Sequence, residues 1–156
     1  MNIEAYIRVL DLYARYARAI DDGRFQDWLD LFADDCSYFV VPLENTRQAL
    51  QLPIIRCRTR AMLNDRIVSL QQANIYNIHT DRHLITNVQL IRETTDRIEV
   101  EADFAIHQTD QEGESRLFGV GRYRTELVGP LHALRIRAQH VTLDTASVPT
   151  LMATPL

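Results

Sequence analysis

The feature that most constrains this fold is the segment from Tyr16 to Val40, where several local signals follow one another within 25 residues. An amphipathic helix leads into it, because apolar and small residues recur at intervals of three and four positions. These residues are Ile3, Tyr6, Ile7, Leu10, Tyr13, Ala14, Ala17 and Ile20. The helix is expected to end at Asp21-Asp22-Gly23, with Gly23 as a left-handed cap.

A short second helix and the first strand are predicted next. Phe25, Trp28, Leu29 and Phe32 continue the helical spacing for two turns, and Asp34-Asp35 then breaks it with a turn. Residues 36–41 have the composition of a strand. We expect Trp28, Leu29 and Phe32 to pack with the first helix against the apolar face of a sheet.

The rest of the chain is predicted to contain one more helix and a meander of four strands. Residues 42–53 lack a clean period and lie between prolines, which indicates an irregular loop. Residues 59–74 carry an apolar stripe and are expected to form a third helix. From residue 82 the period changes to two, with turns at 93–96, 110–113 and 129–130.

The second of these strands has the clearest alternation. Its apolar residues are Ile98, Val100, Ala102, Phe104 and Ile106, and its acidic residues are Glu99, Glu101 and Asp103. One face of the sheet is therefore expected to form the core. Gly119 and Gly121 lie inside the next strand, where glycine commonly marks a bulge or a sharp bend, as a strongly curved sheet requires.

Length and charge limit the classes of function. A chain of 156 residues with 46% hydrophobic content suits a single domain over residues 1–156. The net charge of −4 argues against nucleic acid as a partner. All 17 basic residues are arginine, which fits arginine-rich interfaces with carboxylates and fits equally well a GC-rich genome that replaces lysine codons.

The two cysteines and the apolar runs bear on the compartment. Cys36 and Cys57 are expected to be buried free thiols in a reducing environment. The N-terminus lacks the basic and apolar regions of a signal peptide, and no apolar run is long enough for a membrane span. The sequence thus predicts a cytoplasmic protein with no membrane contact.

Metal and cofactor motifs are not recognisable. A Rieske cluster needs two cysteines and two histidines in paired motifs, but neither Cys36 nor Cys57 has a histidine within three residues. His79 and His83 are the one close histidine pair, and they fall where the third helix has ended and a strand begins. We expect no metal and no cofactor in this chain, and its histidines to be hydrogen-bonded or exposed.

General acid–base chemistry is an alternative that the sequence leaves open. Aspartate, histidine and tyrosine side chains that meet in an internal cavity can donate and abstract protons. The candidate residues are Tyr13, Tyr16, Asp35, His83 and Tyr123. The competing interpretation gives Asp35 to a turn and the tyrosines to the core.

Arg56, Arg58 and Arg60 form the densest basic cluster. They are candidates for contact with acidic residues of a partner chain. Internal ion pairs or a solvated strand edge explain the cluster equally well.

Several segments resemble a known family. The start of the chain resembles the opening of the nuclear-transport-factor-like, cystatin-like cone fold. The chain as a whole is similar to the small, or β, subunit of aromatic-ring-hydroxylating dioxygenases, most of all those of the terephthalate and salicylate type. The segments that carry the resemblance are Asp34-Asp-Cys-Ser-Tyr38, Met62-Leu-Asn-Asp-Arg-Ile67, Ala73-Asn-Ile-Tyr76 with Arg82-His-Leu84, and Thr150-Leu-Met-Ala-Thr-Pro-Leu156.

The resemblance implies a fold and a division of labour. The fold is α+β, a curved antiparallel sheet wrapped around three helices from the N-terminal half. The Rieske [2Fe–2S] cluster and the mononuclear Fe(II) belong to a large α subunit, and a non-catalytic β subunit supports a hexamer of three α and three β chains. The alternative is a free-standing lyase or isomerase that uses the acid–base residues above.

The outer face of the sheet is the expected interface. It mixes Glu99, Glu101 and Asp103 with Arg122 or Arg124 and with apolar Ile85 and Ile91. Such a mixture suits a protein contact. We expect a homotrimer through this face even without α chains, and contact with α through Arg56, Arg58 and Arg60.

Overall fold

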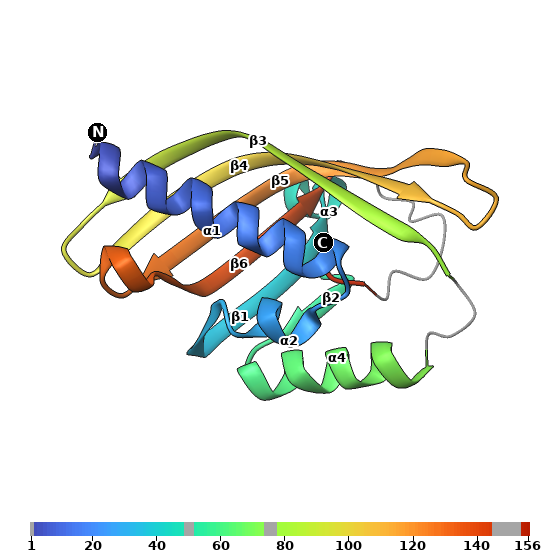
Figure 1. The fold of residues 1–156 in the computed structure, drawn as a ribbon. Helices are drawn as coiled ribbons and strands as arrows, with labels where there is room; N and C mark the ends of the chain where they lie inside the picture. The colour runs from blue at the N-terminus through green and yellow to red at the C-terminus, as the bar shows by residue number, and fades with distance from the viewer. Residues whose placement is uncertain (1, 49–51, 74–77, 145–153) are drawn as a thin grey trace.

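A computed structural model describes residues 2–48, 52–73, 78–144 and 154–156, and in it a curved six-stranded sheet wraps around a long helix (Figure 1). The strands lie in the order β2-β1-β6-β5-β4-β3. They are β1 (Phe32–Pro42), β2 (Ile55–Cys57), β3 (Thr80–Glu93), β4 (Arg97–Thr109), β5 (Ser115–Val128) and β6 (Arg135–Leu143). The helices are α1 (Ile3–Asp21), α2 (Phe25–Leu29), α3 (Leu43–Arg47) and α4 (Arg60–Ala73), with a 3-10 turn, η1 (Leu131–Ala133).

The predicted α+β class is confirmed, with one parallel pairing in the sheet. β3, β4, β5 and β6 form the predicted antiparallel meander, and β2 pairs antiparallel with β1. β1 and β6 run parallel, from Ser37 beside Ala138 to Pro42 beside Leu143. The first strand thus joins the end of the meander and places α1 and α2 on the concave side (Figure 1).

Both ends of α1 are capped by the residues that flank the helix in the sequence. The side-chain oxygen of Asn2 accepts from the backbone N–H of Glu4 at 3.1 Å and of Ala5 at 3.3 Å. At the other end Gly23 has φ +70°, as predicted. Its N–H donates to Ile20 O, and the N–H of Arg24 donates to Ala19 O, which is the Schellman arrangement.

The predicted buried face of α1 is partly wrong. Ile3, Ile7 and Leu10 are 68%, 57% and 40% exposed. The residues that α1 buries are Ala5, Val9, Leu12, Tyr13, Tyr16, Ala19 and Ile20. Two interleaved apolar series run along this helix, and the helical period alone cannot say which of them meets the sheet.

The segment between the first helix and the third differs in detail from its prediction. Phe32 and Asp34-Asp35 belong to β1 and not to a helix and a turn; β1 pairs with β6 at Phe32 and, after an irregularity that spans the two aspartates, from Ser37 onward. The predicted loop at 42–53 contains α3, and β2 follows it. The last strand begins at Arg135, because η1 occupies residues 131–133. The predicted third helix is α4, and Thr59 caps it by accepting from the N–H of Met62 at 3.2 Å.

The two strand glycines serve different purposes. Opposite Ile106 and His107 the ladder skips Phe118, so a bulge lies directly before Gly119, as predicted. At Gly121 the reason is close approach, since an added Cβ would lie 2.0 Å from Thr142 O.

The core lies between the helices and the concave face of the sheet and is dominated by aromatic rings. Phe104 stacks on Tyr123 with 4.3 Å between ring centroids, and Trp28 contacts Phe32 edge-on at 4.8 Å. The predicted packing of α2 residues with the sheet is confirmed in one cluster, which contains Trp28, Leu29, Phe32, Val100, Ala102, Phe104 and Ile106. None of the helices in the described part of the chain is long and apolar enough to cross a membrane.

Candidate functional site

Four of the five candidate acid–base residues lie in the interior of the cone. Tyr13, Tyr16 and Tyr123 are at most 3% exposed, and the side chain of His83 is fully buried. Tyr16 and Tyr123 contact each other edge-on, with 5.8 Å between ring centroids. Helix α1 supplies two of these residues, and the facing strands β3 and β5 supply the others.

Asp35 does not join them. It lies on β1 with its side chain 67% exposed, and its carboxylate pairs with Arg137 of β6 at 3.2 Å. The predicted turn at Asp34-Asp35 was wrong, because both residues are exposed positions of β1, at the irregularity in its pairing with β6.

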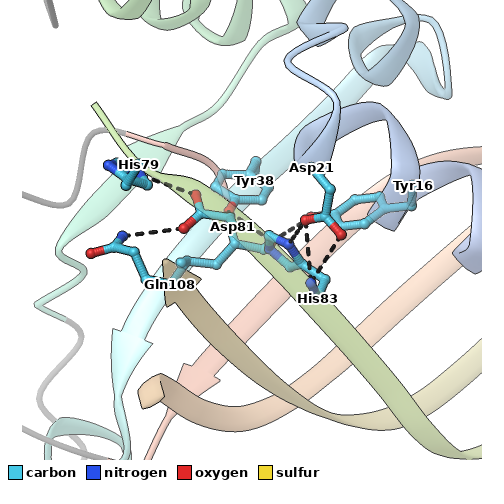
Figure 2. A network of polar contacts seen from close by, with 8 residues as sticks. Tyr16, Asp21, Tyr38, His79, Asp81, His83 and Gln108 are labelled. Atoms are coloured by element: carbon cyan, nitrogen blue, oxygen red, sulfur yellow. Dashed lines mark hydrogen bonds and ion pairs between the residues drawn. The ribbon is translucent and has the colours of Figure 1, made fainter. Parts of the chain in front are cut away.

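His83 is held by a residue that the sequence did not single out. Its Nδ1 lies 2.6 Å from Asp21 Oδ1, and its backbone N–H donates to the same carboxylate at 3.0 and 3.2 Å (Figure 2). Because an ionised carboxylate can only accept, Nδ1 of His83 carries the hydrogen of this bond. Nε2 is buried and has no partner among the described residues.

The sequence offered one signal for Asp21. The residue ends α1, where an acidic side chain faces the negative end of the helix dipole and is disfavoured. Its assignment to the helix stop at 21–23 was correct but incomplete, because its partner lies 62 positions away.

A second polar group lies beside the first on β3. Asp81 accepts from Gln108 at 3.1 Å, and His79 Nε2 lies 3.3 Å from the other oxygen of Asp81 (Figure 2). Arg116 donates to the amide oxygen of Gln108 at 3.3 Å. His79 and His83 therefore bind two different carboxylates.

Three interior tyrosines, Tyr13, Tyr16 and Tyr38, are hydrogen-bonded to the protein itself, whereas the hydroxyl of Tyr123 has no partner among the described residues. Tyr13 shares a hydrogen bond of 2.7 Å with Thr125, which in turn donates to Gln139 at 2.6 Å. Tyr16 and Tyr38 both donate to the main-chain oxygen of Leu156. Burial raises the pKa of each interior tyrosine above its usual range, so the hydroxyls stay protonated and act as donors.

Cys36 and Cys57 are buried free thiols, as predicted. Burial raises the pKa of both, which disfavours the thiolate that binds metal. Over the described residues, no group of three or more histidine, cysteine, aspartate or glutamate side chains could hold a metal ion.

The convex face of the sheet carries a ladder of ion pairs. Arg122 pairs with Asp103 at 3.1 Å, and Arg124 pairs with Glu101 at 2.9 Å. These positions alternate with the buried residues of β4, so they point away from the helices. Hydrogen bonds from Asn87 and then Arg122 lower the pKa of Asp103. Exposed pairs of this kind add little stability, so the charge pattern is better suited to recognition.

A row of outward residues crosses the sheet at the level of Arg124. Arg124 is in register with His140 of β6, His140 with Phe39 of β1, and Phe39 with Arg56 of β2. The rings of Phe39 and His140 are 5.1 Å apart. Burial, and then Arg124, lower the pKa of His140, which is therefore neutral at pH 7. The row thus joins Arg56 to the ion-pair ladder on one continuous face.

The three arginines of the predicted patch have different surroundings. Arg56 and Arg58 are exposed. Arg60 points back into the fold, where it donates to Leu29 O at 2.6 Å and to Phe32 O at 2.8 Å, and it pairs with Asp30 at 2.9 Å. Its guanidinium fastens the start of α4 to the turn between α2 and β1.

Comparison with known proteins decides the family. Residues 15–150 match the family model described as the ring hydroxylating beta subunit. The chain belongs to the ring-hydroxylating β-subunit family. The segments at 74–76 and 150–153 that first suggested this resemblance lie outside the described residues.

Relatives from this family match the β subunit over nearly its whole length. It is 35% identical to the anthranilate 1,2-dioxygenase small subunit of Burkholderia cepacia, over 99% of this chain and 96% of that protein. It is 29% identical to a terephthalate 1,2-dioxygenase β subunit of a Comamonas species, over 96% and 97%. The crystal structure of a β subunit of a putative aromatic-ring-hydroxylating dioxygenase from Novosphingobium aromaticivorans matches with a TM-score of 0.86 and 32% identity, over 95% and 94%.

This β subunit is therefore a component of a ring-hydroxylating dioxygenase, and its interior fits that role. Polar groups do converge inside the cone, as the lyase alternative requires. However, the hydroxyls of Tyr13, Tyr16 and Tyr38 bind the chain's own Thr125 and Leu156. The crevice between Trp28, Tyr38 and α4 has no room for a water molecule.

Proposed function

We propose that this β subunit is a non-catalytic scaffold in an oxygenase for aromatic carboxylates. It joins, as a single domain, three α chains and two further copies of itself. The observation that carries the proposal is the match to the β-subunit family over residues 15–150. The relatives named for anthranilate and terephthalate support the substrate class, since both compounds are aromatic carboxylates.

The redox centres belong to the α subunit in this proposal. A Rieske cluster is held by two thiolates and two imidazoles, and the mononuclear iron by two histidines and a carboxylate. The residues described here do not fit either group: both thiols are buried with raised pKa values, and His79 and His83 are each committed to a different aspartate. No step of the reaction is therefore assigned to this chain. The reduced state of both cysteines supports a cytoplasmic location.

The convex face of the sheet is the surface we assign to the β–β contact. Its alternating acidic and arginine side chains can exchange partners across a symmetric boundary, because each side chain is already aligned along a rigid strand. Arg56 and Arg58 continue this face at β2, where an α chain would dock. Arg60 supports the patch from within by holding α4 in place.

Co-expression with a neighbouring α-subunit gene tests the proposal. A tagged β subunit should retain α through purification. Charge reversal at Arg56 and Arg58 should weaken that retention by about tenfold or more, if each reversal replaces an attraction by a repulsion. The matched control reverses Arg8 and Arg15, which are exposed on α1, away from the convex face. No retention of α by the unaltered chain would refute the scaffold role, and equal losses in both variants would exclude this patch.

A further inference from the structure

The last residues of the chain lie inside the cone. Leu156 is 2% exposed and belongs to the main core cluster, and Pro155 is buried beside it. The C-terminal end lies between α1 and the β1–β2 side of the sheet (Figure 1). The partners of Leu156 are 140 and 118 positions away, on α1 and β1.

The contact has the geometry of a recognition site. The main-chain oxygen of Leu156 accepts from Tyr16 at 2.5 Å and from Tyr38 at 3.2 Å, and its N–H donates to the hydroxyl of Tyr38 at 2.9 Å. Two phenols thus satisfy the donor and the acceptor of one residue's backbone. Both phenols are fully buried when Leu156 is in place, so its departure removes hydrogen-bond partners from two interior hydroxyls.

The surroundings supply the apolar half of such a site. Pro155 lines a crevice with Trp28, Leu63 and Ile67, at the place where α4 covers the sheet. Leu156 packs in the same core cluster. The pocket is therefore apolar around the side chains, and the hydroxyls of Tyr16 and Tyr38 bind the backbone of Leu156.

We propose that Tyr16 and Tyr38 form a binding site for an apolar Pro-Leu peptide segment, and that Pro155-Leu156 of the same chain occupies this site. The two phenols hydrogen-bond one main-chain oxygen and one N–H of the bound segment, and the core residues pack against its branched aliphatic side chain. A peptide of the same chemistry binds in trans when the internal occupant is weakened. The inference does not depend on the oxygenase role, because it uses only contacts within this chain.

A chain that ends at Thr154 and the peptide acetyl-Thr-Pro-Leu test the proposal. The truncated chain should melt roughly 10 °C lower, because it leaves two buried phenols unpaired and an unfilled core position. Saturating peptide should restore most of this loss and change the emission of Trp28, the chain's one tryptophan. Acetyl-Thr-Pro-Asp is the control peptide and should do neither, since an apolar pocket rejects its charge.

A full-length variant covers the case in which the truncated chain does not fold. Leu156→Ala keeps the main-chain contacts but vacates the side-chain position, so free acetyl-Thr-Pro-Leu should compete with its own chain end. Adding Tyr16→Phe should weaken peptide binding by about tenfold, as expected for one lost hydrogen bond, whereas Tyr6→Phe on the same helix should not. Failure of the leucine peptide to bind Leu156→Ala, or equal binding of both peptides, would overturn the proposal.

Discussion

Asp21 and His83 meet in a hydrogen bond of 2.6 Å although 62 positions separate them in the chain. The imidazole and the backbone N–H of His83 share one carboxylate, whose side chain is 3% exposed. A buried acceptor that serves two donors is costly to remove, because both donors are then left unpaired. The pair joins the end of α1 to the start of β3 and so fixes where the helix crosses the sheet.

Replacement of Asp21 measures how much its hydrogen bonds to His83 contribute to the stability of the fold. Asp21→Leu should lower the free energy of unfolding by about 2–4 kcal/mol, since two buried donors lose their acceptor. Asp22→Leu is the control: its side chain is 50% exposed, and it should change stability by less than about 1 kcal/mol. Denaturant unfolding of both variants gives the comparison, and equal losses would contradict the role assigned to Asp21.

Phe104 tests the core at the same scale. It is 3% exposed and stacks on Tyr123, so Phe104→Ala should cost about 3–5 kcal/mol in unfolding free energy. The same denaturant assay measures it. A loss below about 1 kcal/mol would place this ring at the surface and shift the register of β4.

At the scale of elements, the periodicity of the sequence predicted which helices and strands form, but not which face of each is buried or which strands pair. The cap at Gly23, helix α4 and the meander of β3 to β6 followed from local patterns, because turns and periods act over a few residues. The exposed stripe of Ile3, Ile7 and Leu10, the parallel pairing of β1 with β6 and the pairing of Asp21 with His83 did not follow. Each depends on contacts between distant segments, about which a local pattern carries no information.

The two glycines of β5 form a matched pair at this scale. A Cβ at position 121 would lie 2.0 Å from Thr142 O and 2.9 Å from the ring of Phe104, so Gly121→Ala must push β5 and β6 apart. We expect a loss of about 1–3 kcal/mol or more. A Cβ at position 119 would make one ordinary contact of 3.6 Å with Leu143, so Gly119→Ala should be nearly neutral. Thermal melts of the two variants test this difference. A larger loss of stability in Gly119→Ala than in Gly121→Ala would contradict the described register of β5 against β6.

At the scale of the whole molecule, the concave face of the sheet is filled and the convex face is charged. Aromatic rings occupy the interior, and Pro155-Leu156 closes it from the end of the chain. The convex face presents arginine and carboxylate side chains in register. We therefore propose that this chain meets its partners through its outer face.

The isolated chain should form a trimer through that face. Light scattering over a concentration series should give three times the chain mass of 18.1 kDa. Glu101→Arg should shift the equilibrium toward monomer, because it faces Arg124 with a like charge. Arg15→Glu on α1 is the control and should leave the mass unchanged. A monomer at every concentration would rule out self-association by this surface.

Iron analysis shows directly whether this chain is a scaffold subunit without a redox centre. The isolated chain and its complex with α are purified and their iron contents are compared. We expect no stoichiometric iron in the isolated chain. In the complex we expect two cluster irons and one mononuclear iron for each α subunit. One equivalent of iron in the isolated chain, lost when His79 and His83 are replaced, would show that the chain does hold a metal centre.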